Sequence, residues 1–427
     1  MTRRSGLVGL TLIATTAASF AACSGEEAKR HARDEGGAGG ADASTAGDGA
    51  AIAGDAPNGP TPGGQAGAPT HGGAGPASDA GGAAGDGSVT SPAGSNAGGD
   101  LGIGGAAPAS GLYDVTPLGA LNARGATSWA LNDAGDVVGR SPVDDTTNHA
   151  FLWDSATGIM SDLGRLGALA TNSSEAHGIN NDGLVVGVAF NGANTFFTWQ
   201  GVGTMTGIQG LAGGNAVNDA GQAIGQRLNA VYNAFRWDKV GGFTDLGLLG
   251  TMGANDSYAS SINQAGDVVG DAKTDAGLFH AFLWTEAEGM QDLGTLSTKD
   301  NGSVAIGLND QGQVVGYSGT QDDHTHAFLW TKAGGMLDLG HLGTDAQNVS
   351  HAEDINDTGQ VVGYGRATIS EHAFIWTAED GLRDLNDLLV PGATTEELLD
   401  APAINKSGQI ICNTSAGHTV LLTRHSG

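Results

Sequence analysis

Cysteine is nearly absent from the 427-residue sequence, which contains only Cys23 and Cys412. Two thiols exclude a disulfide framework and a cysteine-rich metal site. Cys412 occupies a place where most copies of a repeated segment, described below, have glycine. We therefore expect Cys412 to be a buried, unreactive thiol.

Basic residues are also scarce. The chain has 18 Lys and Arg residues against 46 Asp and Glu residues, a formal net charge of -28. Such an excess of negative charge repels nucleic-acid phosphates and anionic lipid headgroups, so we expect no nucleic-acid partner. The same charge is compatible with cations and cationic partners.

The sequence has no apolar run long enough to span a membrane as a mature helix. The run over residues 7–22 follows Arg3 and Arg4 and is typical of an export signal. It ends in Phe20-Ala21-Ala22-Cys23, which resembles the lipobox of bacterial lipoproteins, with Phe20 in place of the usual leucine. The resemblance implies a signal peptide over residues 1–22 and lipidation of Cys23, and hence anchoring to the cell envelope, at the outer membrane or cell surface. The alternative is an ordinary signal peptide cleaved after Ala21.

Residues 23–110 form the linker that follows. From about residue 35 onward they are almost all Gly, Ala, Ser, Asp, Pro and Thr, with no aromatic residue. Such a segment cannot bury enough apolar surface to offset its ordering entropy, so we predict a disordered Gly/Ala-rich tether. A Gly-rich chain of about 75 residues has an end-to-end distance on the order of 50 Å. It either holds the next domain away from the membrane or is an insert of unselected length.

A segment of about 46 residues recurs over residues 111–427. Each copy reads S-x-A-x-x-I-N, an N-x-x-G turn, V-V-G, a variable loop, H-A-F-L-W and finally G-M-x-D-L-G, with some copies degenerate. The asparagine of the turn recurs at Asn132, Asn180, Asn218, Asn263, Asn309, Asn356 and Asn405.

The alternation within these pieces predicts four short strands in each copy. The N-x-x-G piece is turn chemistry, with glycine in the left-handed position of a hairpin. It lacks the dense acidic spacing of a calcium loop, so we expect no cofactor, with calcium left open. In H-A-F-L-W, alternation places His, Phe and Trp on one face of a strand. Six of the seven tryptophans share this repeat position, which favours core packing. The recurrent histidine is expected to hydrogen-bond a neighbouring strand or turn.

Four strands in about 46 residues are typical of a propeller blade. The first three strands occur seven times, but the fourth occurs only six times inside the repeats. The missing one fits residues 112–119, before the first turn. We therefore predict an all-β fold, a seven-bladed β-propeller of four-stranded blades closed by an N-terminal strand.

The combination of H-A-F-L-W with N-x-x-G-x-V-V-G resembles the HAF-repeat family of extracellular bacterial proteins, over about residues 112–424. This resemblance implies export and a repeat architecture. It supplies no substrate and no catalytic residues.

Function is expected in the irregular loops between the second and third strands, because loops on a rigid scaffold commonly carry binding. The candidate binding residues there are Asp144, Asp145, Asp271, Asp275, Asp322, Asp323, His324 and Glu371. The main hypothesis is a monomeric binding module with a protein or glycan docked on this loop face. The alternative is a hydrolase or lyase acting on extracellular polysaccharide through loop carboxylates and histidine. G-x-S-x-G, H-E-x-x-H, phosphate-loop and dinucleotide motifs are all missing, and simple solvated acidic loops would look the same.

Overall fold

The computed structural model describes residues 111–426, except 170, 202, 230, 252–255, 344–348 and 368–369. The predicted signal peptide, Cys23 and the predicted tether lie outside the described residues. Within the described ranges, no helix is both long and apolar enough to cross a membrane.

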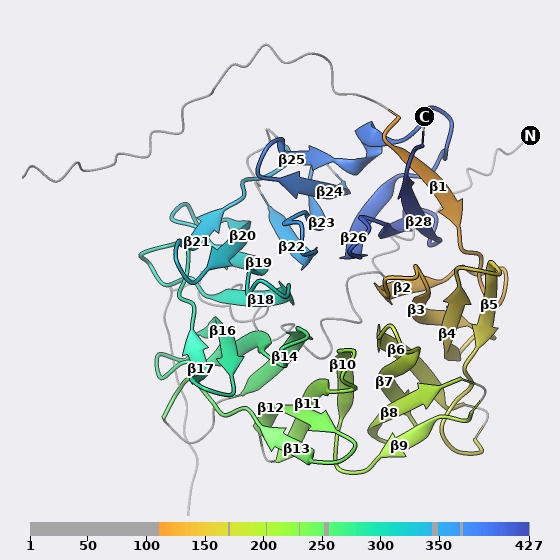
Figure 1. Ribbon diagram of the computed structural model, residues 1–427, viewed down its shortest axis with the longest axis horizontal. Helices are drawn as coiled ribbons and strands as arrows, with labels where there is room; N and C mark the ends of the chain where they lie inside the picture. The colour runs from red at the N-terminus through yellow and green to blue at the C-terminus, as the bar shows by residue number, and fades with distance from the viewer. Residues whose placement is uncertain are drawn as a thin grey trace, which may run out of the picture. The chain divides into compact units, whose positions relative to one another are not determined.

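Seven antiparallel four-stranded sheets, the blades, stand in a ring (Figure 1). Blades 1 to 3 are formed by β2 (Thr127–Leu131), β3 (Val137–Pro142), β4 (Asn148–Asp154) and β5 (Ile159–Asp162); β6 (Ser173–Ile179), β7 (Leu184–Phe190), β8 (Asn194–Gln200) and β9 (Thr206–Ile208); and β10 (Gly213–Val217), β11 (Ala223–Asn229), β12 (Val231–Asp238) and β13 (Gly242–Asp245). Blades 4 to 6 are formed by β14 (Ser257–Ile262), β15 (Val268–Lys273), β16 (Phe279–Thr285) and β17 (Gly289–Asp292); β18 (Ser303–Leu308), β19 (Val314–Gly319), β20 (Thr325–Thr331) and β21 (Gly335–Asp338); and β22 (Ser350–Ile355), β23 (Val361–Arg366), β24 (Glu371–Thr377) and β25 (Gly381–Asp384).

Blade 7 closes the ring with strands from both ends of the repeat region. It contains β26 (Leu398–Ile404), β27 (Ile410–Thr414) and β28 (Thr419–Arg424), and its outer strand is β1 (Tyr113–Pro117). Tyr113 pairs with Arg424 and Pro117 with Val420. A short 3-10 helix, η1 (Leu385–Leu388), leads from blade 6 into blade 7. The predicted fold and the predicted closing strand are therefore confirmed.

The N-x-x-G turns join the first and second strands of each blade. In blade 1 the Gly135 amide donates to the Asn132 carbonyl at 3.0 Å, and the Asn132 amide donates to the Asp136 carbonyl at 3.0 Å. Gly135 has a φ of +88°, the left-handed region that favours glycine. The predicted turn chemistry is confirmed.

The seven turn asparagines link every blade to the next. Each side-chain amide donates to the main-chain carbonyl of the corresponding asparagine in the following blade, over 3.0–3.4 Å, and Asn405 returns to Asn132. We call this closed ring of hydrogen bonds the asparagine belt. It explains physically why asparagine recurs, because a side chain with both a donor and an acceptor serves the next blade and its own turn at once.

Alternation along the third strand produces the contacts between blades. Phe151 and Trp153 pack toward blade 7, against Ile411 and Leu421. Ala150 on the opposite face of β4 packs toward blade 2. Because the repeat tryptophans belong to these interblade clusters, the predicted core role is confirmed.

The recurrent histidine pairs with the aspartate of the fourth strand in its own blade. His149 lies 2.9 Å from Asp162, and the equivalent pairs are His280–Asp292, His326–Asp338 and His372–Asp384. These pairs fasten the outer strand to the third strand, as the hydrogen-bonding interpretation predicted. His418 of blade 7 instead contacts Glu396 at 2.9 Å.

Cys412 is fully buried, as predicted. A Cβ on the equivalent Gly139 of blade 1 would stand 2.0 Å from the Thr127 carbonyl oxygen, which explains the glycine of V-V-G. In blade 7 the innermost strand shifts register twice, between Leu398 and Asp400 and between Asp400 and Ala403. The other innermost strands shift once each. The second shift lies opposite Cys412, between its neighbours Ile411 and Asn413.

Candidate functional site

A cavity of about 250 Å³ lies on the axis of the ring and is lined by residues from all seven innermost strands. These strands, β2, β6, β10, β14, β18, β22 and β26, surround the centre of the propeller (Figure 1). We call this space the axial cavity.

One repeat position, three residues before the belt asparagine, reaches the axial cavity in every blade. We call it the axial position. Its residues differ in all seven blades: Trp129, His177, Asn215, Ser260, Ile306, Glu353 and Pro402. The residue directly before the belt asparagine is instead always Leu, Ile or Val. Positions that pack within the scaffold keep the same type of residue in every blade, whereas the axial position brings seven different side chains to the cavity.

An aromatic cluster occupies the wall formed by blades 5 and 6. The rings of Tyr317 and His351 are stacked with their centroids 4.0 Å apart. The Tyr364 hydroxyl lies 2.6 Å from Nδ1 of His351. Burial raises the pKa of Tyr364 well above its ordinary value, so the phenol stays protonated. The tautomer of the His351 imidazole decides which of the two groups donates. All three rings line the axial cavity.

A second aromatic group lies across the axis, on blades 1 and 2. Trp129 meets His177 edge-on, with centroids 5.0 Å apart. The Arg140 guanidinium lies 5.4 Å from the centre of the Trp129 ring and 2.5 Å from a carboxylate oxygen of Glu175. Burial opposes ionisation of Glu175, but the His177 hydrogen bond and the charge of Arg140 outweigh it and lower the Glu175 pKa. Arg140 is thus already neutralised.

Four carboxylates line the cavity on blades 6 and 7: Glu353, Asp354, Glu371 and Asp400. Burial raises the pKa of Asp354 to about 7 and that of Asp400 to about 6. Asp354 accepts hydrogen bonds from the amides of Ile355 and Ile404, and Asp400 accepts from Asn413 at 2.8 Å. These donors are all uncharged, so they only partly compensate for the burial of negative charge.

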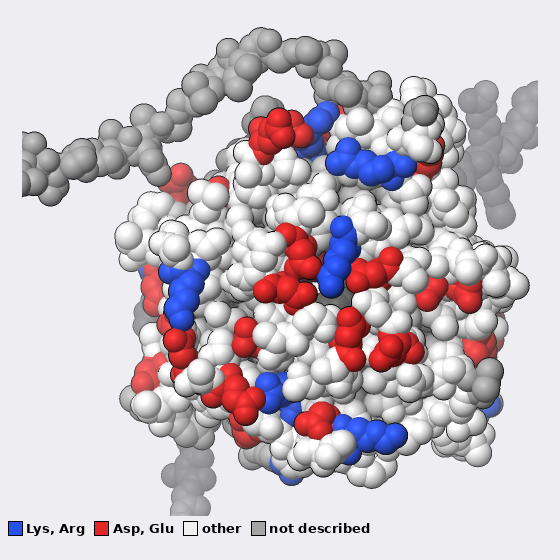
Figure 2. Space-filling model, viewed as in Figure 1, with Lys and Arg blue, Asp and Glu red and all other residues white. Residues whose placement is uncertain are grey.

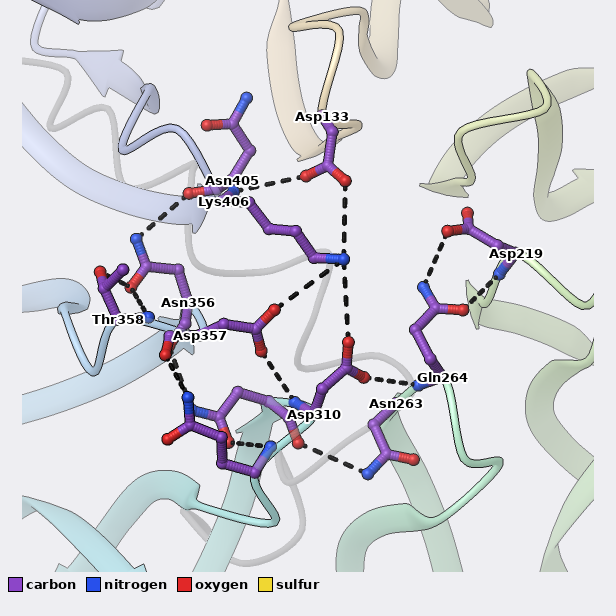
Figure 3. A network of polar contacts seen from close by, with 12 residues as sticks. Asp133, Asp219, Asn263, Gln264, Asp310, Asn356, Asp357, Thr358, Asn405 and Lys406 are labelled. Carbon is purple, nitrogen blue, oxygen red and sulfur yellow. Dashed lines mark hydrogen bonds and ion pairs between the residues drawn. The ribbon is translucent and has the colours of Figure 1, made fainter.

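The belt end of the axis carries a charged group. At the centre of the face in Figure 2, a basic side chain stands among acidic ones, and Figure 3 shows the group from close by. The Lys406 ammonium lies 3.7 Å from Asp133, 3.7 Å from Asp310 and 3.8 Å from Asp357. Partial burial opposes its charge, but these carboxylates outweigh that effect and raise the Lys406 pKa. We call these four residues the lysine cluster.

The loop residues predicted as a binding site are not gathered together. Asp144 caps its own turn, where its carboxylate accepts from the amides of Thr146 and Thr147 at 2.8 Å. Asp145 forms an ion pair with Arg124. These two residues lie in the loop between β3 and β4 of blade 1, and their contacts are local.

The remaining loop candidates lie in other blades. Asp275 accepts from the amide and hydroxyl of Thr251, at 2.6 and 2.9 Å. Asp323 contacts the Lys299 ammonium at 3.1 Å, and its neighbours Asp322 and His324 belong to the same turn between β19 and β20. Glu371 begins β24, is exposed, and lines the axial cavity. Of the candidates, Glu371 is the one that the structure brings to the cavity.

Asp271 requires a correction, since it was predicted to lie in a loop. It lies inside β15 and is 2% exposed. The position after V-V-G is still part of the strand, which continues through Lys273, so the loop begins three residues later than predicted. Burial raises the pKa of Asp271 to about 7, and its Oδ1 has no hydrogen-bond partner. Burial and, to a smaller extent, the charge of Asp271 raise the pKa of Tyr317.

Within the described ranges, no group of three or more His, Cys, Asp or Glu side chains is arranged to hold a metal ion. The sequence interpretation missed the axial residues because it assigned every strand residue to the scaffold. The available signal was the failure of the axial position to repeat, seen when the seven copies are aligned on the belt asparagine.

No protein-family model matches the chain. No curated protein matches it either. Among solved structures, the WD40 β-propeller domain of Doa1 is 14% identical with a TM-score of 0.44, over 74% of this chain and 98% of that one. TolB from Acinetobacter baumannii is 14% identical with a TM-score of 0.38, over 52% and 55%. A Mycobacterium tuberculosis puromycin-hydrolyzing peptidase is 12% identical with a TM-score of 0.45, over 68% and 49%. The alignments thus span about half of the TolB and peptidase chains, and similarities this distant carry no argument about function.

Proposed function

We propose that this chain is an exported, lipid-anchored binding protein whose ligand occupies the axial cavity. The observation that carries the proposal is the axial position, where seven different residues line one cavity inside an otherwise repeated scaffold. A cavity that served only packing would be filled by the same apolar residue in every blade. Concave sites with a few converging polar groups are the usual form of small-molecule sites.

The route into the cavity is set by its two ends. At one end the hydrogen bonds of the asparagine belt and the ion pairs of the lysine cluster link the blades around the axis (Figure 3). At the other, Glu371 is exposed and lines the cavity. The ligand therefore enters from the loop face. A protein or glycan that docks on the loop face would present a small group to the cavity from that side.

The anchoring part of the proposal rests on the resemblance of residues 20–23 to a lipobox. Metabolic labelling with an alkyne fatty acid should mark the parent chain and leave a Cys23→Ser variant unlabelled. Equal labelling of both variants would exclude Cys23 as the lipidated residue.

Binding is tested by screening the purified chain against sugars, amines, amino acids and short peptides, with thermal unfolding as the readout. A ligand of the cavity should raise the melting temperature of the parent. It should fail to do so for Ile306→Trp, which fills the cavity with an indole and deletes no polar group. The control is Asp380→Ala on the exposed turn between β24 and β25, which should respond like the parent. Hits that respond equally in parent and Ile306→Trp bind elsewhere and would contradict the cavity as the site.

A hydrolase or lyase is the second candidate function, and one observation favours it. The Tyr364 hydroxyl and the His351 imidazole share a short hydrogen bond in the cavity that Glu353 also lines. Such a pair could relay a proton during acid–base catalysis. Turnover of an extracellular polysaccharide by the parent, lost in Tyr364→Phe with binding retained, would establish catalysis. Binding without turnover would contradict catalysis and support the proposal of a binding protein.

A further inference from the structure

The described residues that line the axial cavity are predominantly acidic among those that carry charge. Four carboxylates line it, and neither lysine nor arginine occurs among its described lining residues. Arg140, which lies against Trp129 on the opposite wall, already pairs with Glu175. These carboxylates therefore contribute a negative potential inside the cavity, and low-dielectric walls focus such a field.

The carboxylates and the aromatic rings share one wall. The charge of Glu353 acts on both Tyr317 and Tyr364, and the charge of Glu371 acts on Tyr364 and Asp400. A cation held among these carboxylates would therefore also lie near the electron-rich faces of tyrosine rings. Aromatic faces combined with carboxylates are the usual environment for an ammonium group.

Buried negative charge beside this wall is incompletely compensated. Asp271 is 2% exposed and lies next to Tyr317, and its Oδ1 atom has no hydrogen-bond partner. Asp354 and Asp400 are held through uncharged donors. Burial raises the pKa of all three side chains. A cationic ligand would supply the missing countercharge and favour their ionised forms.

The size of the cavity limits the ligand. About 250 Å³ is below the range of roughly 300–1,000 Å³ typical of sites for drug-sized molecules. The space therefore suits a compact group.

We infer that the axial cavity binds a small organic cation carrying a protonated or quaternary amine. This inference rests on the proposed function and names its ligand class. Tyr317 and Tyr364 provide the aromatic rings, and Glu353, Asp400 and Glu371 provide the countercharge.

The test uses probes matched in shape and different in charge. Calorimetric titration of the parent compares choline with 3,3-dimethylbutan-1-ol, putrescine with butane-1,4-diol, and glucosamine with glucose. At least one charged member should bind about tenfold or more tightly than its neutral partner, because the carboxylates attract only the cation. That binding should be lost in Ile306→Trp.

Charge variants then locate the interaction. Glu353→Gln and Asp400→Asn should each weaken binding of the charged probe about tenfold and leave the weak binding of the neutral partner unchanged. Asp380→Asn, on the exposed turn between β24 and β25, removes one negative charge from the surface and should change neither. Equal binding of charged and neutral partners, or no binding of any charged probe, would overturn the inference.

Failure of the inference and failure of the proposed function are distinguishable. If a neutral compound from the wider screen binds and Ile306→Trp abolishes its binding, the cavity is a site but its ligand is not a cation. If charged probes bind with equal affinity to the parent and to Ile306→Trp, they are attracted to the acidic surface, and both proposals lose their support.

Discussion

The side-chain amide of Asn405 donates a hydrogen bond to the main-chain carbonyl of Asn132, 3.1 Å away and 273 residues earlier in the chain. It completes the asparagine belt, because the other six bonds join blades that follow one another in sequence. Two sets of contacts therefore close the ring. Asn405 closes it near the axis, and the pairing of β1 with β28 closes it at the outer edge.

Replacing Asn405 with alanine should destabilise the propeller by about 1–3 kcal/mol, because Asn405 is buried and its partners would lose a donor and an acceptor. Urea unfolding measures this loss. Asn218→Ala removes the equivalent bonds between adjacent blades and should cost a similar amount. An unchanged free energy of unfolding for both variants would show that the belt contributes nothing.

Deleting residues 112–118 should abolish cooperative unfolding, because the outer edge of β28 would lose all its partners in β1. Calorimetry of the full chain without these residues provides the measurement. The control is Asp114→Ala, which removes only the half-exposed contact with His425 and should change stability by less than about 1 kcal/mol. A deletion variant that melts as sharply as the parent would argue against closure by β1.

Asp271→Asn should stabilise the protein at pH 8 and have little effect near pH 4. The folded carboxyl has a pKa of about 7 against 3.8 in a model compound, so the folded state holds a proton that the unfolded state has released. Stability from this group is present below pH 4 and is lost as the pH rises through about 7. The gain at pH 8 should be on the order of 1–4 kcal/mol. The free energies of unfolding of parent and variant, measured from pH 4 to pH 8, test this prediction. A difference between the two proteins that stays the same at every pH would contradict it.

Lys406→Met should lower stability most at low ionic strength, because Asp133, Asp310 and Asp357 would then repel one another. The loss should be about 1 kcal/mol in 20 mM salt and smaller in 500 mM salt, where repulsion is screened. Lys332→Met, which removes an exposed pair with Glu288, is the control and should show little effect. Greater loss in high salt would exclude an electrostatic role for Lys406.

Cys412 should resist alkylation in the folded protein and react fully in denaturant. Its thiol is completely buried, and burial raises its pKa well above the usual value, so almost no thiolate is present at neutral pH. Mass spectrometry after treatment with iodoacetamide measures the reaction. Rapid labelling without denaturant would mean that blade 7 opens readily.

Much of the fold could be predicted from the sequence because its determinants are local and repeated. The turn glycine of N-x-x-G, the alternation in H-A-F-L-W and the unpaired strand at residues 112–119 each follow from backbone geometry within a few residues. The partner of His149 needed the structure, since spacing alone does not reveal that Asp162 lies beside it.

The candidate site could not be predicted in the same way. Trp129 and Tyr364 are 235 positions apart and share a cavity only because the ring closes. Asp271 was misplaced because an acidic residue after V-V-G resembles the start of a loop, whereas β15 continues through Lys273. The sequence does hold one clue, the variation of the axial position, but its meaning depends on knowing which strand lies innermost.

Because Tyr113 and Arg424 are partners in a single sheet, the two ends of the propeller are already neighbours. Circular permutants should therefore be viable, with the old ends joined by a short linker and new ends opened at an N-x-x-G turn of another blade. The axial cavity would be rebuilt from the same seven strands in each permutant. Where translation starts is thus incidental to the axial cavity, which depends only on the cyclic order of the blades.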